Sequence, residues 1–72
     1  MMSMPLTMMG IGETNTIKKI GGREDTRKFL ANLGFVAGGI ITIISKTEGN
    51  LIVTIKDTRV AIDKDMANKI MI

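Results

Sequence analysis

The sequence contains no cysteine and no histidine, and only two of its 72 residues are aromatic. Disulfide bridges, on which small secreted domains commonly depend, are therefore excluded, and a reducing compartment is the natural setting. Without imidazole or thiol groups, neither a Ser-His-Asp nor a Cys-His catalytic arrangement can form, and the groups that hold iron(II) and zinc most firmly are missing. These absences favour a protein that is not an enzyme, and they predict no catalytic, cofactor-binding or metal-ligating residues.

Long apolar runs and concentrated charge are also missing. No stretch of about 18 apolar residues occurs, so no membrane-spanning helix is expected. The methionine-rich start lacks a basic flank and is interrupted by Ser3, Pro5 and Thr7, so a signal peptide is not expected either. The net charge is +3, and the ten basic residues alternate with seven acids instead of forming the basic stripe of a nucleic-acid binder. We therefore expect a soluble, cytoplasmic protein without membrane insertion and without a nucleic-acid partner.

The pattern of apolar residues predicts one domain over residues 1–72, with residues 1–4 frayed. Strands are expected at residues 6–9, 14–20, 40–47, 51–56, 59–62 and 69–72, separated by turns at 10–13, 21–22, 48–50 and 57–58. The Ile-rich segment 40–47 is predicted to be a central strand buried on both faces. Asp63 is expected to cap a single helical turn at 64–67. So many short strands in so short a chain bury a core best by curling. The predicted fold class is mainly β with one short α-helix, as a small SH3-like β-barrel.

One substantial helix is predicted at residues 24–33. Its apolar side consists of Thr26, Phe29, Leu30 and Leu33. This side is expected to lie on the core. Glu24 and Lys28 have the i,i+4 spacing of a helical ion pair. Gly34 is predicted to end the helix in a left-handed conformation, which lets Phe35 fold back onto Leu30.

Two groups of residues remain as candidates for binding. The loop at residues 36–39, Val-Ala-Gly-Gly, follows the helix, and the basic side chains of Arg27 and Lys28 suit an anionic partner or a solvated helix face. Five of the seven methionines lie within residues 1–9, and their thioethers suit Cu(I), although adaptable core packing explains them better. None of the eight glycines stands in a phosphate-binding motif, so they are interpreted as turn residues.

The order of these landmarks resembles the FeoA family, ferrous iron transport protein A, from Pro5 to Ile72. The resemblance is carried by Pro5-Leu6 with Gly12-Glu13, by residues 17–22 ahead of an Arg-bearing helix, by Leu-Ala-Asn-Leu-Gly-Phe-Val-Ala-Gly at 30–38, and by Val60-Ala61-Ile62 with Ala67 and residues 70–72. The third segment is the most characteristic of the family. The chain departs from the family pattern at Ala37, where proline is frequent, and at Gly39, where a polar or branched residue is frequent.

The resemblance implies a non-enzymatic cytosolic partner of FeoB, the membrane iron(II) transporter whose cytosolic part is a GTPase. Such a protein binds and regulates the transporter through protein contact, and it is recruited to the inner face of the membrane through that partner. Combined with the exposed loop and the basic helix, this implication gives a hypothetical partner-binding set: Arg27, Lys28, Phe35, Val36, Gly38 and Gly39. No cofactor is implied, and a weak homo-oligomer stays open.

Three alternatives stay open at this point. SH3-like barrels also serve as nucleic-acid-binding modules, although stacking aromatics, the usual tool of single-strand binders, are scarce here. The same fold occurs as the terminal domain of DtxR-type iron-dependent repressors. A third hypothesis is a direct iron(II) or Cu(I) carrier that uses carboxylates or the methionines of residues 1–9.

Overall fold

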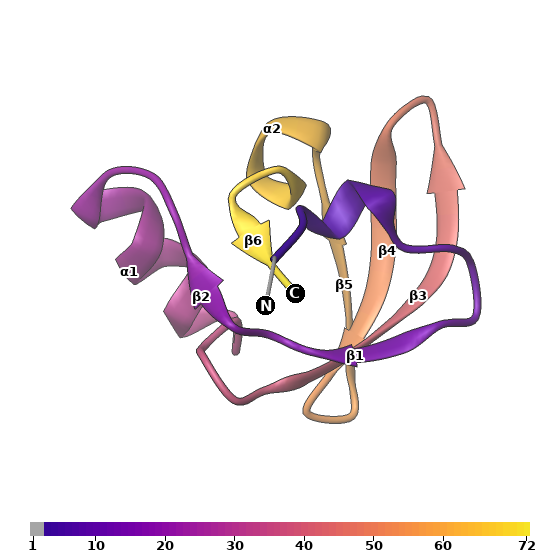
Figure 1. Cartoon of the computed structure of the whole chain (residues 1–72), viewed down its shortest axis with the longest axis horizontal. Helices are drawn as coiled ribbons and strands as arrows, with labels where there is room; N and C mark the ends of the chain where they lie inside the picture. The colour runs from indigo at the N-terminus through magenta and orange to yellow at the C-terminus, as the bar shows by residue number, and fades with distance from the viewer. Residues whose placement is uncertain (1–2) are drawn as a thin grey trace.

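The computed structural model describes residues 3–72 of the chain and is mainly β (Figure 1). In chain order the elements are η1 (Leu6–Met8), β1 (Thr14–Thr16), β2 (Lys19–Ile20), α1 (Glu24–Asn32), β3 (Ile40–Thr47), β4 (Asn50–Ile55), β5 (Thr58–Ile62), α2 (Lys64–Ala67) and β6 (Ile70–Met71). The strands form a four-stranded sheet in the order β1-β3-β4-β5 and a two-stranded sheet of β2 and β6. All the pairings are antiparallel.

The predicted mainly β class is confirmed, whereas the closed barrel is not. Within residues 3–72 the two sheets are not joined into one continuous ladder. A single apolar core nevertheless lies between them, and the part of the chain that the structure describes buries no polar side chain. The core consists of Leu6, Met9, Ile17, Leu30, Phe35, Ile41, Ile43, Leu51, Val53, Ile55, Ile62, Ala67, Ile70 and Ile72.

Strand β3 has the predicted bounds and the predicted central position, but it is not buried on both faces. Ile41 and Ile43 are buried, whereas Ile40 is 63% exposed and Ile44 is 37% exposed. Elements η1, α2 and β6 contribute Leu6, Ala67 and Ile70 to the core that Ile41 and Ile43 face, so they lie on one side of the four-stranded sheet, and the side that carries Ile40 and Ile44 is left uncovered. A strand in that position alternates between core and solvent. We call this uncovered side the outer face.

The predicted strand at 14–20 is divided between the two sheets. Its first part, β1, pairs with β3, and its second part, β2, pairs with β6. Between them Ile17 is buried. The alternation of side chains along the sequence does not reveal this change, because both partners are remote in the chain.

The predicted strand at 6–9 is wrong, because residues 6–8 form the 3₁₀-helix η1. Met9 N donates to Leu6 O at 2.9 Å, and both side chains are fully buried. A 3₁₀ turn places residues three apart on the same side, so it buries this pair together, whereas a strand would point them to opposite faces. Residues 1–4 were expected to be frayed, and two of them, Met1 and Met2, lie outside the described residues. Met4 exchanges two backbone hydrogen bonds with Ile72, at 3.0 and 2.8 Å.

The first hairpin turn is one residue shorter than predicted, and the second lies one residue earlier than predicted. Glu48 and Gly49 connect β3 to β4 with φ of 51° and 88°. Lys56 and Asp57 connect β4 to β5 with φ of 49° and 63°. Two consecutive left-handed residues are what a two-residue turn needs to match the twist of the flanking strands.

Helix α1 begins as predicted at Glu24 and ends one residue early, at Asn32. Its C-terminal cap is the predicted one: Gly34 has φ of 108°, Gly34 N donates to Ala31 O, and Phe35 N donates to Leu30 O, both at 2.9 Å. This is the Schellman pattern, in which a glycine accepts the left-handed conformation that other residues resist.

The predicted core-facing side of α1 is wrong in most of its members. Leu30 is fully buried, but Phe29 is 49% exposed, Leu33 is 36% exposed and Thr26 is only half-buried. The helix projects from one side of the molecule (Figure 1), so one of its residues, Leu30, packs in the core, and a continuous apolar stripe along the helix does not. At the other end of the chain, α2 is capped as predicted, with Met66 N donating to Asp63 Oδ1 at 2.8 Å.

Candidate functional site

The loop at residues 36–39 is fixed by backbone hydrogen bonds on both of its sides. Gly39 N donates to Val36 O at 3.0 Å and closes the loop. Gly38 N donates to Ile17 O and Ile17 N donates to Gly39 O, both at 2.8 Å. Gly38 has φ of 90°, and a Cβ built on it would meet no atom within 4 Å. The loop is therefore held in place at its base and open to solvent at its tip.

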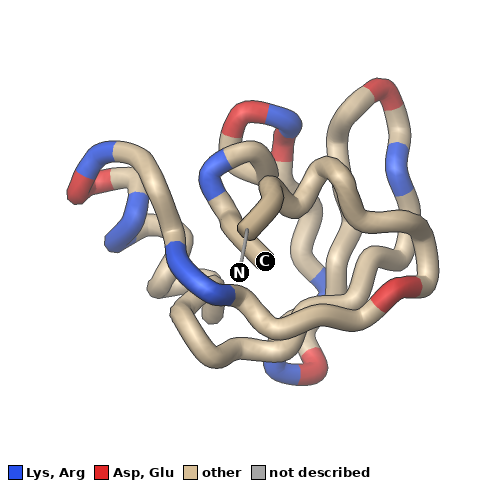
Figure 2. The backbone as a smooth tube through the Cα atoms, viewed as in Figure 1, with Lys and Arg blue, Asp and Glu red and all other residues tan. Residues whose placement is uncertain are grey.

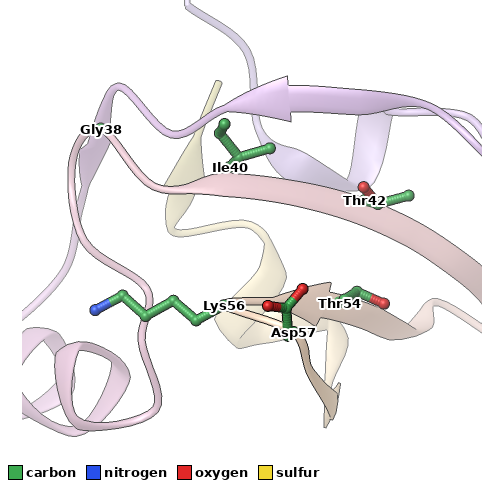
Figure 3. A pocket seen from close by; sticks show the side chains of 6 residues that line it. All are labelled: Gly38, Ile40, Thr42, Thr54, Lys56 and Asp57. Carbon is green, nitrogen blue, oxygen red and sulfur yellow. The ribbon is translucent and has the colours of Figure 1, made fainter.

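A shallow groove of about 460 Å³ adjoins the tip of this loop. Its lining residues are Gly38, Ile40, Thr42, Thr54, Lys56 and Asp57 (Figure 3). We call it the β3–β4 groove, because Ile40 and Thr42 belong to β3 and Thr54 to β4. Thr42 lies opposite Thr54 in the sheet, and its hydroxyl shares a hydrogen bond of 2.8 Å with the hydroxyl of Thr14 in β1.

The groove combines an apolar wall with groups that bind polar atoms. Ile40 is 63% exposed and supplies the apolar surface. Thr54 adds a hydroxyl, and Lys56 and Asp57 add one charge of each sign at the end of β4. Within residues 3–72 neither Lys56 nor Asp57 belongs to an ion pair. Such a surface suits an extended polypeptide segment that presents an apolar side chain together with a polar or charged one.

The structure keeps part of the predicted partner-binding set together and separates the rest. Val36, Gly38 and Gly39 form the loop, whereas Phe35 is fully buried beneath it and has no surface to offer a partner. The backbone N–H of Phe35 completes the cap of α1 and its side chain packs in the core, so Phe35 fixes the start of the loop.

Arg27 and Lys28 do not join the groove. Lys28 is paired with Glu24, with Nζ and Oε1 3.5 Å apart. It lines a separate hollow at the first turn of α1, together with Arg23, Glu24 and Asp25, and this hollow shares no residue with the β3–β4 groove. Charges of both signs lie close together at that turn (Figure 2). The basic residue beside the loop is Lys56 instead.

Sequence reasoning missed the residues that line the groove, Ile40 and Thr42 on one strand and Thr54, Lys56 and Asp57 on the other. Ile40 was expected to be buried, and the other four belong to segments read only as strand and turn. One signal was present: an isolated hairpin turn with a Lys-Asp pair presents two opposite charges at the end of a sheet. The position of that turn beside Gly38 is tertiary and has no local signature.

The described residues show neither a metal cluster nor a membrane-spanning helix. In residues 3–72 no group of three or more His, Cys, Asp or Glu side chains lies close enough to hold a metal ion. No helix in the same part of the chain is long and apolar enough to cross a bilayer.

The two sheets, the single helix before β3 and the glycine loop define a small mainly β protein with an SH3-like architecture. The chain belongs to the FeoA domain family, whose model matches residues 4–72. This match confirms the resemblance seen in the sequence. No curated protein sequence matches the chain.

Solved structures agree with this assignment. The iron uptake regulatory protein FeoA is 28% identical to this chain, with a TM-score of 0.89 over 97% of this chain and 95% of the other. FeoA of Stenotrophomonas maltophilia in complex with zinc is 20% identical, with a TM-score of 0.78 over 97% of this chain and 87% of the other. A manganese-dependent transcriptional repressor is 18% identical, with a TM-score of 0.88 over 97% of this chain but only 40% of the repressor. The latter two likenesses show the fold alone.

Proposed function

We propose that this protein is a non-enzymatic accessory of ferrous iron uptake that binds the cytosolic region of a FeoB-type GTPase transporter and regulates it. The observation that carries the proposal is the match of the FeoA domain family to nearly the whole chain, residues 4–72. The 28% identical structure belongs to an iron uptake regulatory protein. For the Stenotrophomonas maltophilia protein a role as a ferrous iron transport activating factor has been suggested. Iron(II) is the cargo of the transporter in this proposal and not a resident ligand of the chain.

The loop at 36–39 and the β3–β4 groove form the docking surface in this proposal. They are contiguous, because Gly38 belongs to both. The loop is held at its base, so its ordering costs little when a partner binds. The groove adds exposed apolar area at Ile40 and charge at Lys56, and a surface of this composition is typical of transient protein contacts.

Regulation follows from unequal affinity for two states of the transporter. A partner that binds one conformer more tightly shifts the population toward it by the difference in binding free energy. This mechanism needs no chemistry from the chain, which is consistent with the lack of histidine and cysteine. It requires only that the docking surface on the transporter differ between the two conformers.

The test is a binding titration with the cytosolic region of a FeoB-type transporter. Lys56→Glu is expected to weaken binding by about tenfold, since charge reversal at a docking surface costs on the order of 1 kcal/mol or more. Lys28→Glu is the matched control, because it makes the same change in the hollow that shares no residue with the groove. Equal effects of the two variants would contradict the assignment of the docking surface, and no binding by the wild-type protein would contradict the proposed function.

A direct nucleic-acid-binding role has less support. Phe35 is buried, and Phe29 is the one aromatic side chain of the protein that reaches the surface, at 49% exposure. The expectation that both phenylalanines serve the core or the cap is therefore wrong for Phe29. Proteins that bind single-stranded nucleic acids combine several stacking aromatic side chains with a basic groove, and one exposed phenylalanine on a helix does not supply this combination.

A further inference from the structure

The edge of β1 that faces away from β3 carries backbone groups to which no residue among 3–72 bonds. Ile43 N donates to Glu13 O at 3.1 Å, and Ile17 N donates to Gly39 O at 2.8 Å. These bonds lie two residues on either side of the Asn15–Ile41 pair, so Asn15 also points its backbone groups at β3. Thr14 and Thr16, which alternate with these residues, point their N–H and C=O groups to the opposite side.

The side chains support this assignment. In an antiparallel ladder the residue pairs without mutual backbone bonds bring their side chains closest together. Thr14 and Thr42 form such a pair, and their hydroxyl oxygens are 2.8 Å apart. All three residues of β1 are exposed, and within residues 3–72 no backbone or side-chain group bonds to the outward N–H and C=O of Thr14 and Thr16.

The open side of β1 lies in line with an existing strand. Lys18, two residues after Thr16, donates its N–H to Met71 O at 2.7 Å. Backbone groups two residues apart point to the same side of a strand. Beside Lys18 this side is occupied by β6, whereas beside Thr14 and Thr16 no residue of the described range 3–72 bonds there. An extended segment placed there would follow the line of β6 and run antiparallel to β1.

Exposed apolar side chains lie next to this edge, and one charged residue of each sign flanks it, Glu13 before β1 and Lys18 after it. Ile40 is 63% exposed and Ile11 is 62% exposed. Ile40 pairs with Thr16, and Ile11 lies in the turn that leads into β1. No charged residue occurs within β1 itself. Natural edge strands are commonly protected by charge, proline or a bulge, and the three residues of β1 carry none of these between the flanking charges.

We propose that β1 is a strand-addition site, at which a short extended segment of the transporter's cytosolic region pairs with the outward groups of Thr14 and Thr16. This inference rests on the proposed function, because it names the part of the partner that this chain holds. The segment fits if it is uncharged and rich in branched or apolar residues at its centre, with a carboxylate near the end that lies beside Lys18. Backbone pairing supplies affinity, and the neighbouring Ile11 and Ile40 select apolar side chains.

Proline substitution tests the pairing of an added strand with β1 without disturbing the pairing of β1 with β3. Thr16→Pro removes an outward N–H and places a ring where the added strand would lie, yet it removes no bond of the β1–β3 ladder. We expect the unfolding midpoint to stay near that of the wild-type protein, while the affinity for the cytosolic region of the transporter falls about tenfold or more. Thr16→Val keeps the N–H and is the matched control, with unchanged affinity expected.

Amide exchange supplies a second measurement on the unmodified chain. The Thr14 and Thr16 amides are expected to exchange quickly in the free protein and to become protected in the complex, whereas Asn15 and Ile17 are protected in both. If Thr16→Pro binds as tightly as the wild-type protein, or if the two threonine amides stay unprotected in the complex, strand addition is overturned and the proposed function stands. If the wild-type protein does not bind the transporter at all, both are overturned.

Discussion

The four-stranded sheet and helix α1 are attached to the same core in different ways. Along β4 every second side chain, Leu51, Val53 and Ile55, is buried, so the sheet is held over its whole length. Helix α1 contributes Leu30 alone, and Phe29 and Leu33 stay at least one-third exposed. The sheet is therefore stabilised by distributed burial, and the helix by one buried side chain and its C-terminal cap.

The largest expected effect lies in the sheet. Ile43→Ala removes a fully buried side chain of β3 and should lower the free energy of unfolding by about 2–5 kcal/mol, because it leaves a cavity. Ile40→Ala makes the same change in the same strand at a side chain that is 63% exposed, and it should stay within about 0.5 kcal/mol of the wild-type protein. Urea denaturation followed by circular dichroism measures both. Similar losses for the two variants would mean that the outer face is covered in solution.

An intermediate effect is expected at the helix cap. Gly34 has φ of 108°, and a side chain in the left-handed region costs about 1–2 kcal/mol, so Gly34→Ala should destabilise the protein by that amount. Crowding is not the cause, because an added Cβ would lie 3.6 Å from Ile55, an ordinary contact. Gly34→Asn should be milder, since asparagine tolerates this conformation better. Thermal unfolding of the two variants side by side distinguishes backbone strain from lost packing.

The smallest effect is expected at the start of the helix. Glu24 and Lys28 form an i,i+4 ion pair whose side chains are 74% and 75% exposed. Solvent screens such a pair, so Glu24→Gln should change the free energy of unfolding by no more than about 0.5 kcal/mol. The change should shrink further in 1 M salt, where the Debye length is about 3 Å. A loss comparable to that of Gly34→Ala would show that the first turn is coupled to the core.

Much of the fold could be predicted from local patterns. The bounds of β3, the alternation along β4, the glycine cap at Gly34 and the Asp63 cap of α2 each depend on a few neighbouring residues, and all are confirmed. The errors have a common cause. The exposure of Ile40 and Phe29 depends on where other elements lie. Hydrophobic periodicity shows that the two faces of a strand or helix differ in polarity, but it does not show how much of each face other elements cover.

The candidate site was predictable only in part. The loop glycines Gly38 and Gly39 were found, because consecutive glycines mark a turn before a strand. The groove beside them was not, since it joins β3 to the β4–β5 turn across the sheet. Lys56 and Asp57 adopt left-handed φ values without being glycine, and nothing in their own sequence shows that they lie beside Gly38.

The backbone of Ile17 links the loop and the two sheets. Its N–H and C=O both bond to residues 38 and 39, while the chain on either side of it belongs to a different sheet. A partner bound to the loop therefore also restrains Ile17, at which the chain leaves the four-stranded sheet and enters the two-stranded sheet. Binding at the four residues of this loop should therefore stabilise both sheets. Complex formation should raise the resistance of the domain to mechanical unfolding and to proteolysis, also at sites distant from the loop.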